Sequence, residues 1–95
     1  MDVEKILKKA LKGKVYFGSK RTIKALKKGE AKLVIVSANC PKEIREKIER
    51  YRRDVPVLIY PGTNMELGAQ CGKPFSVASL AVIEADISDV DLMKA

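Results

Sequence analysis

The cationic side chains of one predicted helix are the first candidates for chemistry. This helix is expected to start after Gly18 and to end at Gly29. On a helical wheel Ile23 and Leu26 point toward the core, and the opposite arc holds Lys20, Arg21, Lys24, Lys27 and Lys28. The N–H groups of the first turn, near Gly18 and Ser19, add a positive helix end that suits a phosphate or a base edge. The alternative is a solvated helix face that binds nothing.

The charge of the whole chain is unevenly distributed, in a way that favours a polyanionic partner. Residues 1–53 hold 17 of the 19 Lys and Arg residues but only 6 of the 12 Asp and Glu residues. That segment carries a net charge of +11, whereas residues 54–95 carry −4, which together give the +7 of the chain. A positive field of this density on a small protein is typical of nucleic-acid binding.

Two loop positions could add base contacts to the charged helix. Asn39 directly follows a predicted strand, and its amide is either free to read a base edge or caps the next helix. Ligands often bind where the strands of an α/β sheet end, so the position is of interest. Phe75 lies in a polar loop beside Lys73, where an aromatic ring can stack on an unpaired base. The alternative for Phe75 is burial in the core, the usual environment of a lone phenylalanine.

Enzymatic interpretations find little support in the residue types. The chain has no His, which excludes a Ser-His-Asp triad and a Cys-His pair. Cys40 and Cys71 stand without a second pair of cysteines, so no metal site is expected. Cys40 precedes a predicted helix, where the pKa of a thiol can fall, but a phosphatase loop would need Arg at the position of Glu46. We expect no catalytic residue, no metal and no cofactor.

The elements that position these residues alternate between helix and strand. Helical spacing predicts a first helix capped by Asp2, then the cationic helix, then a third helix with Pro41 as its first residue. A capping box from Thr63 to Glu66 opens a short fourth helix. Apolar runs predict short strands at 15–17, 33–36, 57–60 and 80–83. This α/β pattern predicts a three-layer α/β/α sandwich, without indicating the strand order.

The third helix is predicted to bury one apolar stripe and to carry ion pairs on its wet side. The stripe consists of Ile44, Ile48 and Tyr51. The i,i+4 pairs are Glu43–Lys47, Glu46–Arg50 and Glu49–Arg53. An acidic tail over 86–95 is compatible with a last helix capped at Asp86 or Ser88.

The length of the chain corresponds to one domain, 1–95, with one core. Its apolar runs are far shorter than the roughly 18 residues of a membrane span, and its first residues lack the apolar stretch of a signal peptide. We expect a cytoplasmic protein that is monomeric when free and has no membrane contact.

Five segments together carry a resemblance to a known family: Gly18–Lys24, Gly29–Val36, Ser37–Cys40, Gly62–Gly68 and Gly72–Val77. In order and spacing they resemble the L-thirty-e family of archaeal and eukaryotic large-subunit ribosomal proteins, within the L-seven-Ae superfamily of kink-turn RNA binders. The resemblance covers residues 14–90. It implies a three-layer α/β/α sandwich with a four-stranded mixed sheet, and RNA binding without catalysis.

The resemblance also assigns roles to individual residues. The superfamily reads the sheared G·A pairs of a kink-turn with an Asn-Glu-x-x-Lys motif at the second helix. Lys20, Arg21 and Lys24 hold those positions here, so only the Lys is retained and the Asn-Glu base contacts cannot be carried over. Lys at the position of Lys20 is common in the ribosomal branch, which the resemblance therefore favours. Asn39 matches the family's Asn after the second strand, and Phe75 matches the loop aromatic that packs on RNA.

We therefore expect a structural protein of the large ribosomal subunit, one that binds an internal loop or kink-turn of ribosomal RNA beside other large-subunit proteins. The alternatives are a kink-turn adaptor of a small-RNA particle, a small Cys40-dependent enzyme, and a protein–protein module that uses the acidic tail. Phe75 and Val77 are expected to cap an exposed base. The expected RNA-binding residues are Gly18, Ser19, Lys20, Arg21, Lys24, Lys27, Lys28, Asn39, Lys73, Phe75 and Val77.

Overall fold

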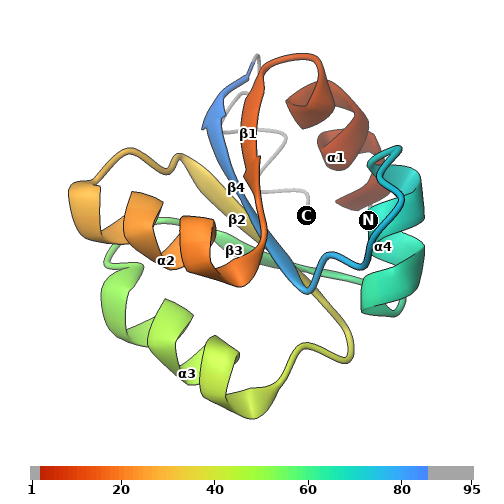
Figure 1. Cartoon of the computed structure of the whole chain (residues 1–95). Coiled ribbons are helices and arrows are strands. Elements are labelled where there is room, and N and C mark those ends of the chain that lie inside the picture. The colour runs from red at the N-terminus through yellow and green to blue at the C-terminus, as the bar shows by residue number, and fades with distance from the viewer. Residues whose placement is uncertain (1–2, 86–95) are drawn as a thin grey trace.

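A computed structural model describes residues 3–85, which form a sheet between two pairs of helices (Figure 1). In chain order the elements are α1 (Val3–Leu11), β1 (Lys14–Phe17), α2 (Ser19–Lys28), β2 (Leu33–Ser37), α3 (Lys42–Tyr51), β3 (Val57–Tyr60), α4 (Asn64–Gln70) and β4 (Ser79–Glu84). The predicted α/β/α sandwich is confirmed. The proposed cap Asp2 and the proposed tail helix lie outside the described residues. Within the described range, no helix is long and apolar enough to cross a membrane.

The sheet is four-stranded and mixed, with the strand order β1-β4-β2-β3. β4 runs antiparallel to both of its neighbours, whereas β2 and β3 are parallel. This topology puts the ends of β1, β2 and β3 and the start of β4 at one end of the sheet, because β4 alone runs in the opposite direction. The loops that leave and enter these strand ends are therefore neighbours.

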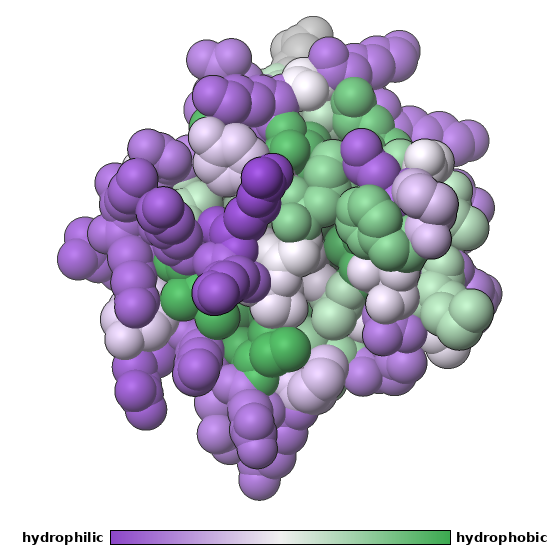
Figure 2. Space-filling view, in the orientation of Figure 1, coloured by the Kyte–Doolittle hydropathy of each residue, from purple (hydrophilic) through white to green (hydrophobic). Residues whose placement is uncertain are grey.

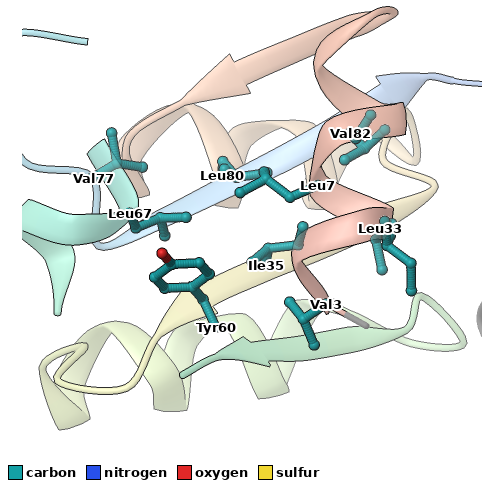
Figure 3. Packing of buried hydrophobic residues seen from close by; sticks show 11 residues of the cluster. Val3, Leu7, Leu33, Ile35, Tyr60, Leu67, Val77, Leu80 and Val82 are labelled. Carbon is teal, nitrogen blue, oxygen red and sulfur yellow. The ribbon is translucent and has the colours of Figure 1, made fainter. Parts of the chain in front are cut away.

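The two central strands bury side chains on both faces, as their unbroken apolar runs predict. Successive side chains of β2 alternate between faces. Leu33 and Ile35 pack with α1 and α4, and Figure 3 shows them in that cluster beside Leu7. Val34 and Val36 pack on the opposite face with α2 and α3. The alternation gives the sheet a hydrophobic layer on each side.

The helix boundaries follow local signals that the sequence contains. α2 ends at Gly29, whose φ of 72° is the left-handed conformation of a glycine C-cap. α4 begins with the predicted capping box, in which the Thr63 side chain accepts a hydrogen bond from the Glu66 N–H and the Glu66 carboxylate accepts one from the Thr63 N–H. Pro41 differs from the prediction: it is the N-cap of α3, with ψ of 141°, and the helix starts one residue later.

The surface of α3 also differs from the prediction. Of its apolar stripe, only Ile48 is fully buried, since Ile44 and Tyr51 remain partly exposed. Arg53 has a φ of 53° and lies beyond the end of the helix, so it cannot pair with Glu49 across a helical turn. Within the described residues, the ion pairs of this segment are instead Lys42–Glu46 at 3.8 Å and Glu49–Arg52 at 3.0 Å.

Candidate nucleic-acid interface

Four connecting segments meet at one end of the sheet: β1–α2, β2–α3, β3–α4 and α4–β4. We call this end of the molecule the loop end. Backbone hydrogen bonds tie them together: the Gly18 N–H donates to the Ser79 carbonyl at 2.9 Å, and the Ala38 N–H donates to the Gly62 carbonyl at 2.8 Å. The Val77 N–H donates to the carbonyl of Asn64 at 2.9 Å. The predicted candidates Gly18, Asn39 and Phe75, which are far apart in the sequence, thus belong to segments that share this end of the molecule (Figure 1).

The start of α2 is open to an approaching ligand. Gly18 has a φ of 102°, which an L side chain rarely adopts, and a Cβ placed there would meet no atom within 4 Å. Within the described part of the chain no side chain caps this helix, so its first N–H groups remain available. The Ser19 hydroxyl accepts a hydrogen bond from the Ser79 hydroxyl at 2.9 Å, which anchors this turn to the start of β4.

Asn39 has a role that neither sequence interpretation described. Its amide is not free, and it does not cap α3. The Asn39 Oδ1 accepts hydrogen bonds from the Asn64 N–H at 2.8 Å and from the Ser37 hydroxyl at 3.0 Å, while its Nδ2 donates to the Asn64 Oδ1 at 3.3 Å. The Asn64 N–H is one of the unpaired donors of the first turn of α4, so Asn39 satisfies a helix start from a neighbouring loop. The exposed Asn39 thereby links the β2–α3 loop to α4.

Phe75 and Val77 stand two positions apart in the same loop but in opposite environments. Phe75 is 55% exposed, so the interpretation of Phe75 as a core residue is wrong. Val77 has no exposed surface and lies in the core beside Leu67 (Figure 3). The expectation that the Val77 side chain caps a base is therefore wrong, because the side chain has no surface to offer. Its burial anchors the loop that presents Phe75.

The loop that carries Phe75 packs directly on the backbone of α4. The Lys73 N–H donates to the Gly68 carbonyl at 2.9 Å, so the chain turns back along the helix it has just left. A Cβ at Gly68 would lie 2.1 Å from the Phe75 carbonyl oxygen, a backbone atom that no side-chain movement can relieve. The absence of a side chain at Gly68 lets this loop lie against the helix.

Lys73 turns toward the start of the cationic helix. Its ammonium lies 4.6 Å from the centroid of the Phe17 ring, at the end of β1. Phe17 immediately precedes Gly18, so this cation adds positive charge next to the α2 N-terminus.

The cations of α2 divide between two grooves instead of forming one face. The groove on the β1 side has a volume of about 310 Å³ and is lined by Tyr16, Arg21, Lys24, Ala25, Lys28 and Glu30. The groove on the α3 side, the α2–α3 groove, has a volume of about 490 Å³ and is lined by Lys20, Ile23, Lys24, Lys27, Lys47, Arg50 and Tyr51. Leu26 points to the core as predicted, whereas the partly exposed Ile23 lines the second groove.

Several residues at these surfaces were missed by the sequence interpretation. Asn64 was treated only as part of a capping box, and Met65, which is 74% exposed on the first turn of α4, was not considered. Tyr16 was assigned only to a strand. Lys47 and Arg50 were assigned to ion pairs within α3. A charge pattern does not show whether a Lys or Arg side chain turns toward its own helix or toward a neighbouring helix. No local signal therefore indicated that Lys47 and Arg50 face α2.

The cysteines do not have the environment of activated thiols. Burial raises the pKa of the Cys40 thiol, although the Arg45 guanidinium lowers it. Burial likewise raises the pKa of the Cys71 thiol, against a smaller lowering by Lys73. A raised pKa leaves little thiolate at neutral pH, which is unfavourable for nucleophilic catalysis. Among the described residues no group of His, Cys, Asp and Glu could hold a metal ion.

The chain is similar to known proteins over most of its length. A family model described as the ribosomal protein L7Ae/L30e/S12e/Gadd45 family matches residues 1–91. The "Large ribosomal subunit protein eL30" of Archaeoglobus fulgidus is 60% identical, covering 87% of this chain and 95% of the relative. The protein of the same name from Methanopyrus kandleri is 53% identical, covering 94% of this chain and 84% of the relative.

A solved structure supports the fold independently. The "Giardia lamblia 15.5kD RNA binding protein" matches with a TM-score of 0.69 and 23% identity, over 84% of this chain and 68% of that chain. At this identity the likeness concerns the fold alone. The fold, the family model and the sequence relatives agree, and the chain belongs to the ribosomal protein L7Ae/L30e/S12e/Gadd45 family.

Proposed function

We propose that this chain is a structural protein of the large ribosomal subunit, and that it binds an internal loop or kink-turn of ribosomal RNA through the loop end. Family membership and the large-subunit names of its relatives support the ribosomal role. The observation that carries the site is the exposed Phe75 ring on a loop that is tied to α4 and lies at the same end as the open start of α2.

Each part of the loop end has a distinct role in this proposal. Gly18 lets the backbone come close to the RNA, and the N–H groups that follow it in the first turn of α2, from Ser19 on, have no side-chain cap among the described residues. Lys20 and Arg21, both exposed in the first turn, meet phosphates or base edges. Phe75 stacks on an unpaired base.

The remaining predicted residues support these contacts. Lys24, Lys27, Lys28 and Lys73 supply positive charge around the start and along the length of α2. Asn39 acts mainly by positioning, because its Oδ1 is occupied by two donors. The side chain of Val77 is withdrawn from the list of contacts.

Two alternative functions are less well supported. A kink-turn adaptor of a small-RNA particle would use the Asn-Glu pair that Lys20 and Arg21 replace here. A Cys40-dependent enzyme would need a thiol of lowered pKa, whereas burial raises the pKa of Cys40. The ribosomal proposal includes a cytoplasmic, ribosome-associated chain without catalytic activity, monomeric when free and in contact with neighbouring large-subunit proteins.

Sedimentation of the purified protein with separated ribosomal subunits tests the proposal. Large subunits stripped of this protein should take it up with one copy each at moderate salt, and small subunits should not. A variant with Arg21→Glu and Phe75→Ala should lose most of this uptake while remaining folded. Equal uptake by both subunits, or uptake that the variant retains, would contradict the proposal.

Binding to isolated RNA separates the ribosomal role from the adaptor role. The protein should prefer a fragment of large-subunit RNA over a small-RNA kink-turn with matched stems. The reverse preference would favour the adaptor.

A further inference from the structure

The α2–α3 groove leads away from the loop end along the outer face of the molecule. Lys20, Lys24 and Lys27 form one wall at positions i, i+4 and i+7 of α2, so they share one side of the helix. Lys47 and Arg50 form the other wall. None of the described residues that line the groove carries a carboxylate. Figure 2 shows hydrophilic side chains crowded over α2 and α3, with a strip of apolar surface between the two helices.

The cations on the α3 wall have no ionic partner among the residues that the structure describes. The two carboxylates of α3 that form ion pairs take Lys42 and Arg52 as partners, at 3.8 and 3.0 Å. Lys47 and Arg50 are left exposed and facing α2. Two positive walls facing each other without a counter-charge repel, and an anion between them would relieve that repulsion.

The floor and length of the groove suit a chain of phosphates. Ile23 and the partly exposed Tyr51 form an apolar floor against which a sugar can pack. The Lys27 ammonium lies 4.8 Å from the centroid of the Tyr51 ring, which directs this cation across the groove. Seven residues of helix span about 10 Å, the axial length of about three phosphates on one strand of a nucleic-acid duplex.

We propose that the α2–α3 groove binds the phosphate backbone of the RNA duplex that continues from the internal loop. This inference rests on the proposed function, since the loop end must hold the internal loop. An internal loop is flanked by duplex on both sides, and the groove begins at Lys20, in the first turn of α2. A strand that leaves the loop end therefore meets the groove at its first cation, and phosphate contacts along it fix the orientation of the duplex without reading its sequence.

The test compares two RNAs that share one internal loop and differ only in the length of the flanking duplex. The variant Lys47→Gln with Arg50→Gln removes two charges from the groove and touches no residue of the loop end. The variant Lys8→Gln with Lys12→Gln removes two charges from exposed positions at α1, on the opposite face of the sheet, and is the matched control. Affinity is measured for each pair at several salt concentrations.

For the long-flank RNA, the groove variant should make the plot of log affinity against log salt shallower by about 2, close to one unit for each lost phosphate contact. For the short-flank RNA, the slope should stay unchanged. The α1 control should leave both slopes unchanged, and melting temperatures should agree among the three proteins.

An unchanged slope for the groove variant on the long-flank RNA would overturn the inference. An equal change in the α1 control would also overturn it, because the effect would then come from net charge instead of the groove. A wild-type protein that binds neither RNA would contradict the proposed function, and the groove inference would fall with it.

Discussion

The loop end and the outer face of α2 both contact RNA in the proposed function, but different forces shape them. At the loop end, hydrogen bonds between Asn39 and Asn64 and a close backbone contact at Gly68 define the position of each segment. On α2, five cations stand without an acidic residue on the same helix. In the proposed function the loop end would therefore contribute shape and stacking, which depend little on salt, whereas α2 would contribute charge, which salt screens.

The largest effect on stability and RNA binding is expected at Gly68, where the absence of a side chain lets the Phe75 loop pack against α4. Gly68→Ala forces a Cβ against the Phe75 carbonyl, and should destabilise the fold by at least about 2 kcal/mol. Gly13→Ala is the matched control, since its Cβ would meet the Glu84 carbonyl at the opposite end of β1. Thermal melts should show a loss of stability in both variants, but only Gly68→Ala should weaken RNA binding by the folded molecules. If the two variants bound RNA with equal affinity, Gly68 would have no role in positioning Phe75 for RNA.

Val77 tests whether the loop is anchored through the core. Val77→Ala removes two methyl groups from a fully buried site and should cost about 2 kcal/mol of stability. Chemical denaturation measures this cost. Under conditions where the variant remains folded, its RNA affinity should stay within about threefold of wild type, since the side chain offers no surface. A large loss of RNA affinity with unchanged stability would show that the Val77 side chain contacts RNA.

The contribution of charge is tested by a single cation at the start of α2. Lys20→Ala removes one exposed charge, and the salt dependence of binding should become shallower by about one phosphate contact. Its stability should change by less than about 0.5 kcal/mol, as is usual for an exposed position. Binding isotherms at several salt concentrations measure the slope. A parallel shift of the plot, with its slope unchanged, would show that Lys20 does not contact a phosphate.

The smallest effect is expected at the cysteines. Because burial raises the pKa of both thiols, their thiolate fraction at neutral pH is below that of a free cysteine, and alkylation should be slow at neutral pH and accelerate as the pH rises. Replacing both Cys40 and Cys71 by Ser should leave RNA affinity within about threefold. Rapid alkylation at neutral pH, or a folded double variant without RNA binding, would revive a role for a thiol.

The comparison also shows which features the sequence could predict. Strands such as β2 could be located because an apolar run without alternation is buried on both faces of a sheet. The first residue of α4 could be predicted because a capping box depends on only four consecutive residues. The bond between Asn39 and Asn64 could not be predicted, since it joins residues 25 positions apart whose contact depends on the strand order. The exposure of Phe75 and the burial of Val77 depend on how the loop folds back along α4. No single residue near them in the sequence determines that path.

The number of cations on α2 could be predicted from the sequence, but the direction in which their side chains point could not. The sequence identified the cations of α2, yet their division between two grooves depends on where α3 and β1 lie. The predicted pairs Glu43–Lys47 and Glu46–Arg50 were wrong. Glu46 pairs with Lys42, which leaves Arg50 without it, and among the described residues Glu43 and Lys47 form no ion pair. Propensity and spacing describe one helix at a time, whereas the direction of a long side chain depends on its neighbours.

The RNA affinity and stability of Phe75→Ala test the central claim most directly. Because Phe75 is 55% exposed, the melting temperature should hardly change. RNA affinity should fall by about 1–3 kcal/mol, the value of one stacked base, and by the same amount at low and high salt, because stacking releases no counterions. A fall in melting temperature with unchanged affinity of the folded protein would contradict the account, as would a loss of affinity that disappears at high salt.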